Sequence, residues 1–210
     1  LIHNAVERIT PVSCNVIREK YGLEKDSYIL YVGRISPEKG PQDLLEAYQK
    51  LRLQERLVLA GPIPETEFGK EMIRKIDADP RVIRTGLVQG QELAELFSNC
   101  RLFVLPSHTE GLSLALLEAM SCGGRCLVSD IPANTVITGQ YGAEFEAENR
   151  DSLAAALSKE LTTPKDEVLL KQEMEYVKEN FDYDAVIEWH EDVYKCALNR
   201  KNEKRWEQNC

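Results

Sequence analysis

The sequence predicts an α/β fold built on a doubly wound parallel sheet, with extra helices at the C-terminal end. Two observations predict it. From residue 28 onward, short runs of aliphatic and β-branched residues alternate with stretches whose apolar residues recur at helical spacing. The connections between these segments are short, which favours parallel strands joined by right-handed helical crossovers.

The strands are predicted from short apolar runs that end at turn-forming residues. Gly33, Gly61-Pro62 and Gly86 end the first three runs. The fourth run is continuously apolar, as expected for a strand covered on both faces. The predicted strands are Tyr28–Val32, Leu57–Ala60, Val82–Thr85, Leu102–Pro106, Cys126–Ser129 and Ala143–Ala147.

The helices are predicted from apolar residues spaced three and four apart. Those between strands are Pro41–Leu53, Phe68–Ile76, Gln91–Asn99, Leu112–Ser121 and Ser152–Leu161. Asp151 is the expected N-cap of the last of these. Two more helical patterns, Lys165–Asn180 and Tyr183–Leu198, follow with no strand between them, and their apolar stripes indicate packing on the core.

Composition narrows the function classes. The chain has 210 residues and a net charge of −9, with 43% hydrophobic and 29% charged residues, which fits one globular domain and is too short for two full α/β domains. A nucleic-acid-binding protein is not indicated, because no basic block precedes Arg200–Arg205. That tail is interpreted as a solvated helix end, with a membrane or RNA contact as the alternative. No apolar run is long enough to span a bilayer.

The cysteines do not form a metal-binding pattern. Cys122 and Cys126 flank a Gly-Gly turn, but no histidine lies nearby and no CxxC pair occurs among the six cysteines. We therefore expect buried cysteines in a reducing compartment and no metal site.

Chemistry is expected in the loops that follow the strands, because doubly wound sheets bind ligands at the carboxyl ends of their strands. The first such loop runs from Gly33 to Gly40. Gly33 allows a ligand close to the backbone, while Arg34 and Lys39 supply two cations suited to phosphate oxygens. Taken alone, this segment is equally compatible with a surface loop that carries incidental charges.

The second such loop leads from Pro106-Ser107 into a helix that is expected to begin near Gly111–Leu112. Glu110 lies in the loop. The N–H groups of Leu112, Ser113 and Leu114 are expected to be free at the helix N-terminus, where they would form an anion site. Gly111 and Ser113 are small enough to let a diphosphate approach.

Glu118 is unusual because it lies in the apolar run Leu114–Met120, where a buried carboxylate needs partners. Two ribose hydroxyls would satisfy it. A neighbouring cation or exposure to solvent would also explain it, but its spacing from Glu110 favours the ligand.

These stretches resemble glycosyltransferase family 4, the glycosyltransferases group 1, and specifically the C-terminal domain of a GT-B enzyme with its Rossmann-like fold. The resemblance extends to about Leu198. The matching segments are Tyr31–Gly40, Val82–Gly86, Leu105–Met120, Val128–Pro132 and the final helix, with Asn4–Glu7 as an altered form of the family's entry to this domain. There Ala5 and Glu7 replace the usual Gly and Asp, and Thr135 stands near a position that is often acidic.

The resemblance implies a role for each matching residue. Arg34, Lys39 and Glu110 would form the catalytic group, with the two cations on the diphosphate and Glu110 on the sugar hydroxyls, as a positioning residue rather than a nucleophile. The implied donor-binding residues are Gly33, Leu87, Val88, Gly111, Leu112, Ser113, Leu114 and Glu118. Leu87 and Val88 would border the base and Glu118 would hold the ribose.

The implied reaction transfers a sugar from a nucleoside diphosphate sugar to a glycan, lipid or other acceptor. It retains the anomeric configuration and needs neither metal nor cofactor. Cations would replace a metal by stabilising the charge that develops on the leaving diphosphate.

The expected domain organisation is a junction at residues 1–20, a nucleotide-sugar-binding domain at 21–164, and C-terminal helices at 165–210 that pack on this domain and toward an N-terminal domain. We expect an acceptor-binding N-terminal domain to be missing, so that the isolated chain is inactive. The full-length enzyme would be cytoplasmic and could contact the inner face of the membrane through that domain.

Several alternatives stay open. A sugar-phosphate synthase or a sugar-nucleotide epimerase of the same fold would tolerate the same residues, and a non-catalytic nucleotide-binding module is a third choice. A dehydrogenase domain is disfavoured because GRISPEKG replaces GxGxxG after the first strand. His108, in the loop before Glu110, could contact the sugar or be held by hydrogen bonds within the loop. The base, the sugar, the acceptor and the oligomeric state are not determined by the sequence.

Overall fold

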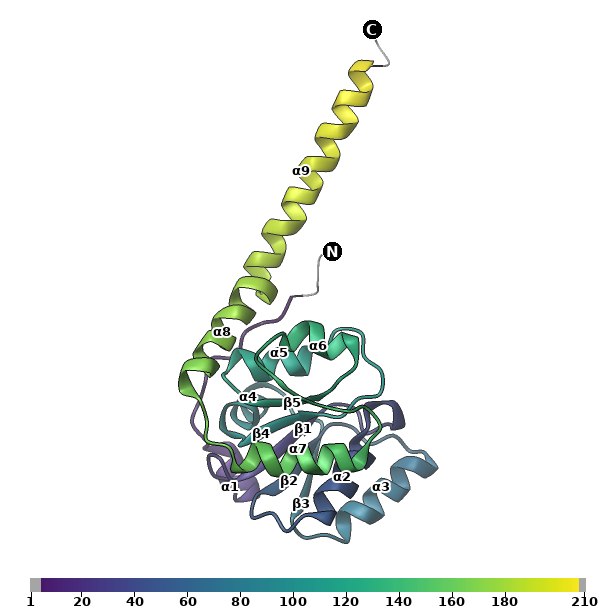
Figure 1. Ribbon diagram of the computed structural model, residues 1–210, viewed down its shortest axis with the longest axis vertical. Helices are drawn as coiled ribbons and strands as arrows, with labels where there is room; N and C mark the ends of the chain where they lie inside the picture. The colour runs from purple at the N-terminus through teal and green to yellow at the C-terminus, as the bar shows by residue number, and fades with distance from the viewer. Residues whose placement is uncertain (1–4, 208–210) are drawn as a thin grey trace.

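The computed structural model describes residues 5–207, with side chains described up to residue 198, and contains a six-stranded parallel sheet (Figure 1). The strand order is β3-β2-β1-β4-β5-β6. The bounds are β1 Tyr28–Val32, β2 Arg56–Ala60, β3 Val82–Gly86, β4 Leu102–Leu105, β5 Cys126–Ser129 and β6 Ala143–Phe145. The doubly wound parallel sheet predicted from the sequence is therefore confirmed.

Helices cover both faces of the sheet (Figure 1). The helices between strands are α2 Pro41–Lys50, α3 Glu67–Asp77, α4 Gly90–Asn99, α5 Leu114–Ser121, α6 Pro132–Thr138 and α7 Arg150–Thr162, with a short 3₁₀ helix at Pro37–Lys39. Alternate residues of one strand point to opposite faces. In β1, Leu30 therefore packs beneath α4 and α5, whereas Ile29 packs beneath α2 and α7.

Two predicted helices differ from the structure at one end, and one helix of the structure was not predicted. Helix α7 begins at Arg150, since Asn149 and not Asp151 is its N-cap and accepts from the N–H groups of Asp151 and Ser152. Helix α2 ends at Lys50, and Leu51 and Leu53 pack on the core from the following loop. Helix α6 has no counterpart among the predicted elements.

The predicted junction at residues 1–20 is partly incorporated into the domain. Helix α1, Val16–Tyr21, packs on α4, so the predicted boundary at residue 21 falls inside a helix. Asn15 does not cap α1 with its side chain. Instead the buried carboxylate of Glu95 accepts from the N–H groups of Asn15 and Ile17, at 2.8 and 3.1 Å.

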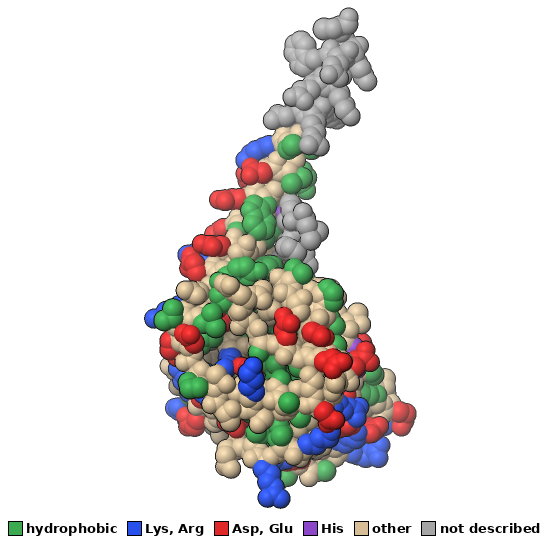
Figure 2. All heavy atoms as spheres, in the orientation of Figure 1, with side chains coloured by type: hydrophobic (Ala, Val, Ile, Leu, Met, Phe, Trp, Pro, Cys, Tyr) green, Lys and Arg blue, Asp and Glu red, His purple; other side chains and the backbone are tan. Residues whose placement is uncertain are grey.

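The two C-terminal helices behave differently from each other. Helix α8, Glu167–Phe181, packs against α5 and buries Val177 and Phe181. Helix α9, Tyr183–Glu207, projects away from the body of the domain (Figure 1) and leaves apolar side chains exposed along it, which are visible in Figure 2. The predicted packing of the C-terminal helices on the domain is therefore found for α8 and for the first turn of α9, where Val186 is buried.

Candidate functional site

The candidate site lies where the chain order across the sheet reverses, between β1 and β4. These strands pair in parallel, with Ile29 opposite Leu102 and Leu30 opposite Phe103. Both loops that the sequence singled out therefore leave the same edge of the sheet from adjacent strands. In open α/β sheets this position is where ligands bind.

The two loops are in direct contact. The backbone N–H of His108 donates to the carbonyl of Glu38 at 2.9 Å. Gly40 has a φ of +67°, and a Cβ there would lie 2.0 Å from the carbonyl oxygen of Pro106. A side chain at position 40 would therefore separate the loops, which gives this glycine a steric reason beyond its backbone conformation.

Lys39 and Glu110 meet across this contact. The Lys39 Nζ lies 2.7 Å from one Glu110 carboxylate oxygen, and the Ser107 hydroxyl donates to the other at 2.8 Å. The side chain of Glu110 is only 7% exposed and that of Lys39 is 28% exposed. The carboxylate is thus held on both oxygens, which fixes its orientation toward the adjoining hollow.

That hollow has a volume of about 290 Å³. Its wall combines both loops with the start of α5. The residues that line it are Tyr31, Val32, Gly33, Lys39, Leu105, Glu110, Leu112, Ser113, Leu114 and Ala115. Gly33, Leu112, Ser113 and Leu114 therefore lie where the sequence placed them, whereas Gly111 is exposed outside the wall.

The anion-binding end of α5 differs from the prediction by two residues. The helix begins at Leu114, and Ser113 is its N-cap, with its hydroxyl accepting from the Leu116 N–H at 3.3 Å. Within the described chain, the N–H groups of Leu114 and Ala115 have no acceptor. The Leu112 N–H precedes the helix, so its predicted place among the helix-terminal donors is wrong. The serine hydroxyl competes for the first turn and sets the start.

Glu118 lies one turn further along α5 and lines a separate hollow of about 260 Å³, together with residues 7–10 and α4. Burial raises the pKa of Glu118 above its ordinary value. No described residue forms a hydrogen bond or ion pair with its carboxylate. The prediction that both acids share a single cleft is therefore wrong in detail: they open into two hollows along the same helix.

Of the two cations in the first loop, Arg34 has no ion-pair partner among the described residues. Its side chain is exposed, and none of the described acidic groups forms an ion pair with it. Its backbone is fixed, because the buried Tyr31 hydroxyl donates to the Arg34 carbonyl at 2.7 Å. Burial raises the pKa of Tyr31, which keeps this donor protonated.

Leu87 and Val88, which were expected to border the nucleotide base, have side chains that point in opposite directions. Leu87 is 69% exposed, which leaves it available to a ligand. Val88 is 7% exposed and packs in the core beneath α4, so its predicted contact with the base is wrong. Because β3 has just ended, consecutive side chains alternate between solvent and core.

Sequence reasoning missed Asp43. Its carboxylate is buried in the first turn of α2 and accepts from the His108 imidazole Nε2 and the Arg150 guanidinium Nε, both at 2.6 Å. His108 therefore turns away from the Glu110 hollow. The available signal was an acid placed on the core-facing side of an otherwise apolar helix turn, Asp43-Leu-Leu.

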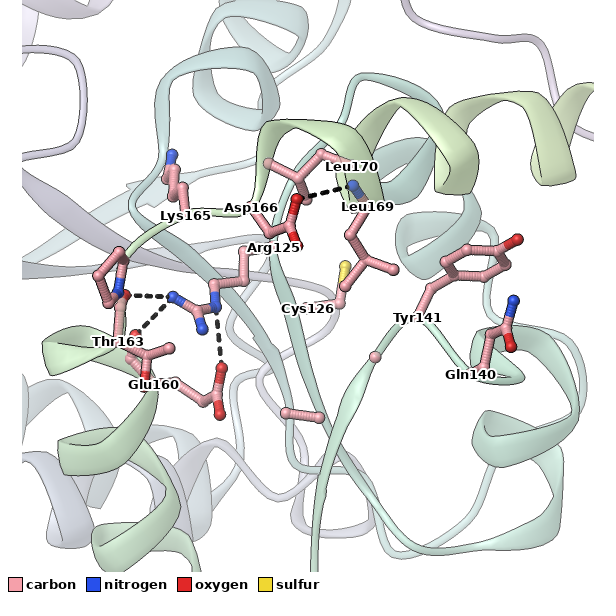
Figure 3. A pocket seen from close by; sticks show the side chains of 13 residues that line it. Arg125, Cys126, Gln140, Tyr141, Glu160, Thr163, Lys165, Asp166, Leu169 and Leu170 are labelled. Carbon is pink, nitrogen blue, oxygen red and sulfur yellow. Dashed lines mark hydrogen bonds and ion pairs between the residues drawn. The ribbon is translucent and has the colours of Figure 1, made fainter.

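A further hollow, of about 310 Å³, lies at the opposite edge of the sheet, where β5 and β6 begin (Figure 3). The Arg125 guanidinium crosses it and bonds the Glu160 carboxylate at 2.8 Å. It also donates to the carbonyls of Glu160 and Thr163 at 2.8 and 2.7 Å. Arg125 thus binds carbonyls at the end of α7 that the helix leaves unpaired, which is a structural role.

The described part of the chain holds neither a metal-binding cluster nor a membrane-spanning helix. Among the side chains described, residues 5–198, no three His, Cys, Asp or Glu side chains gather into a metal-binding group. None of the helices described over that range combines the length and hydropathy of a membrane-spanning segment. On the face shown in Figure 2, acidic and basic side chains are interspersed over the globular body.

Comparison with known proteins identifies the family of this chain. The family model of glycosyl transferases group 1 matches residues 15–179. The chain belongs to this family. It is 30% identical over 157 residues to the O-antigen chain mannosyltransferase B of Escherichia coli, covering 72% of this chain and 41% of that protein. It is 27% identical to an uncharacterised glycosyltransferase of Methanocaldococcus jannaschii, over 86% of this chain and 48% of that protein.

Solved structures of this family's fold superpose well. Sucrose-phosphate synthase of Thermosynechococcus elongatus matches with a TM-score of 0.77 and 25% identity, over 91% of this chain and 50% of that one. HepE of Anabaena, solved with UDP, matches with a TM-score of 0.80 at 19% identity, over 93% and 57%. The chain spans less than half the length of the curated relatives it matches.

Proposed function

We propose that this chain is the donor-binding domain of a retaining glycosyltransferase that uses a nucleoside diphosphate sugar. One observation carries the proposal: the Lys39–Glu110 pair lies 2.7 Å apart in a hollow that also contains the free amides at the start of α5. These are the groups that a sugar attached to a diphosphate requires. The carboxylate is suited to the sugar hydroxyls, and the cation and the helix N-terminus are suited to the phosphates.

Catalysis would depend on stabilising the leaving diphosphate. As the bond between the anomeric carbon and the phosphate oxygen breaks, negative charge grows on the phosphate. An ammonium has three N–H donors, so Lys39 keeps two for phosphate while one binds Glu110. Arg34, free of acidic partners in the described chain, and the N–H groups of Leu114 and Ala115 add further donors.

Glu110 is proposed to position the sugar and not to attack it. Both of its oxygens already accept a donor, from Lys39 and Ser107, which lowers the nucleophilicity of the carboxylate. Its remaining lone pairs can accept hydroxyl groups of the sugar. The proton of the acceptor would pass to the leaving phosphate, which needs no protein nucleophile.

Glu118 is proposed to hold the ribose. The two hollows lie along successive turns of α5, so an extended ligand could place its sugar beside Glu110, its diphosphate at Leu114 and its ribose beside Glu118. The unpaired carboxylate would then gain two hydroxyl partners. Leu87, exposed after β3, is the proposed contact for the base.

The rest of the enzyme is also proposed. Because the chain spans less than half of its relatives, we place the acceptor and part of the sugar pocket in an N-terminal domain outside this sequence. We propose a metal-independent reaction, since cations supplied by the protein fill the role of a metal. The full-length enzyme is proposed to act in the cytoplasm and to reach a membrane-bound or polymeric acceptor through that domain.

Calorimetric titration of the 210-residue chain tests the proposal. UDP, GDP and ADP, together with UDP-glucose and GDP-mannose, form the panel. We expect weak binding of at least one nucleotide with no sugar transfer, and loss of that binding in Lys39→Ala but not in Lys50→Ala, whose lysine lies at the far end of α2. Absence of binding across the panel would refute donor binding, and efficient transfer by this chain would refute the missing acceptor domain.

A sugar-phosphate synthase is the second candidate, favoured by the similarity to sucrose-phosphate synthase. Both enzymes would use the same donor site. Product analysis of the full-length protein with free sugar phosphate as acceptor separates the two, because a transferase acting on a glycan or lipid gives no phosphorylated disaccharide.

A further inference from the structure

We propose that His108 is a positioning residue for Glu110, acting through its hydrogen bond to the buried carboxylate of Asp43. The proposal rests on the proposed function insofar as Glu110 contacts the donor sugar. The bond joins the acid-bearing loop, two residues before Glu110, to the first turn of α2. It therefore controls where Glu110 lies relative to Lys39, which is two residues before the start of that helix.

Asp43 is a rigid anchor for the imidazole. It is 7% exposed, and its two carboxylate oxygens are divided between two donors: one accepts from His108 and the other from Arg150. Arg150 begins α7, which packs beside α2, and it also forms an ion pair with Glu46. The anchor thus belongs to two packed helices and not to a mobile loop.

His108 is tied to the same segment through its backbone. Its N–H donates to the Glu38 carbonyl at 2.9 Å, while its Nε2 reaches Asp43 at 2.6 Å. The next amide, of Thr109, reaches the Glu38 carbonyl only at 3.4 Å, which is a weak bond. The imidazole therefore supplies one of few firm links between the two loops outside the Lys39–Glu110 pair itself.

The consequence is specific to the sugar end of the ligand. Sites that hold a reacting group tolerate little displacement, and a shift of about 1 Å can be costly. Removing the imidazole would loosen Glu110 without altering Glu118 or the start of α5, which face the nucleotide in the proposed arrangement. Affinity for a nucleotide sugar should fall more than affinity for its parent nucleoside diphosphate.

Two variants of His108 test the role, with one control variant and one replacement variant. His108→Leu removes the donor, and His108→Gln restores an N–H that can reach Asp43. His190→Leu repeats the first change on the exposed face of α9 and is the matched control. Asp43→Asn, which keeps the shape but weakens both bonds, replaces His108→Leu if that variant fails to fold.

The first measurement is amide hydrogen exchange of the ligand-free chain. We expect exchange in residues 106–113 to rise roughly tenfold in His108→Leu, the change expected from losing one hydrogen bond to a charged group, and to return in His108→Gln. Exchange in β5 and β6 should stay unchanged. Unaltered exchange in residues 106–113 would overturn the proposal whether or not the chain binds nucleotides.

The second measurement compares Kd for UDP-glucose with Kd for UDP, and for GDP-mannose with GDP. We expect the ratio of Kd for the nucleotide sugar to Kd for its nucleoside diphosphate to rise about tenfold in His108→Leu and to recover in His108→Gln. An equal loss for both partners of a pair would show a merely structural role and overturn the proposal. Failure of the unmodified chain to bind any of these ligands would count against the proposed function, and the exchange measurement would still decide the role of His108.

Discussion

Two buried carboxyl groups, one beside each end of helix α5, differ in their ionisation. Beside its N-terminus, Glu110 has a cation and a hydroxyl within hydrogen-bond distance. At its C-terminal end, Glu173 of α8 packs near Cys122 and Cys126, is 1% exposed, and has one carboxyl oxygen with no partner among the described residues. Burial raises the pKa of Glu173 to about 9, so it is a neutral acid at pH 7.

The presence or absence of partners separates a candidate ligand site, at Glu110, from a packing contact, at Glu173. An ionised carboxylate can be kept in a protein interior only if partners replace its water, which Lys39 and Ser107 do for Glu110. A carboxyl group without such partners takes up a proton instead. Glu118 lies between the two extremes, with a raised pKa and an opening to solvent through which a ligand could supply the missing partners.

The largest expected effect is at Glu173. Its pKa is raised on folding, so its contribution to stability is complete below about pH 4.5 and is lost as pH rises toward 9. The free energy of unfolding should fall by on the order of several kcal/mol over that window. Glu173→Gln, which cannot ionise, should remove this fall, as measured by urea denaturation at a series of pH values.

The neighbouring titratable groups do not obscure this test. Burial raises the thiol pKa values of Cys122 and Cys126 in the folded chain, so these thiols lower the free energy of unfolding only as pH approaches the thiol pKa of the unfolded chain, about 8.5, and the comparison is made below about pH 8. Glu179→Gln, on the exposed side of α8, is the matched control and should keep the pH dependence of the unmodified chain. If the free energy of unfolding changed with pH in the same way in the unmodified chain and in Glu173→Gln, Glu173 could not be a neutral acid in the folded chain.

The Lys39–Glu110 pair should show the next largest effect. Lys39→Ala leaves a nearly buried carboxylate without its cation and should lower the free energy of unfolding by about 1–3 kcal/mol. Glu110→Gln should cost less, because the amide still accepts from Ser107 and leaves only the more exposed lysine unpaired. In a double-mutant cycle the two losses should not add. Additive losses would show that the pair is not coupled.

The smallest effect on stability is expected at Glu118, where the change should appear in binding. Glu118→Gln should weaken nucleoside diphosphate binding about tenfold, while the free energy of unfolding near neutral pH changes only slightly and in the stabilising direction, because Gln carries no charge to desolvate. In the unmodified chain the affinity should decline as pH falls toward the raised pKa of Glu118, because the protonated acid is a poorer acceptor. Calorimetry at several pH values checks both, with the exposed Glu144→Gln as control. A pH-independent affinity would argue against the ribose contact.

Much of the fold followed from the sequence because its signals are local. Short apolar runs between turn residues identified the six strands, and a ligand was expected at the carboxyl ends of the strands. That the first and fourth strands are neighbours came from the structure. Glu110 and Lys39 were found for the same reason, since each lies in a loop directly after a strand. Helix α6 was missed, and the starts of α5 and α7 were misplaced because one side-chain acceptor, Ser113 or Asn149, decides each boundary.

By itself, the sequence determined the α/β class, the two loops and the residues that could carry charge to a ligand, because hydrophobic periodicity and turn chemistry act over a few residues. Tertiary structure alone decided which of those residues meet. It joined His108 to Asp43, turned Val88 into the core, and left Glu118 without a partner among the described residues, in a hollow apart from Glu110. These outcomes depend on the register of strands and the packing of helices distant in sequence, and no local pattern encodes the partner of a buried charge.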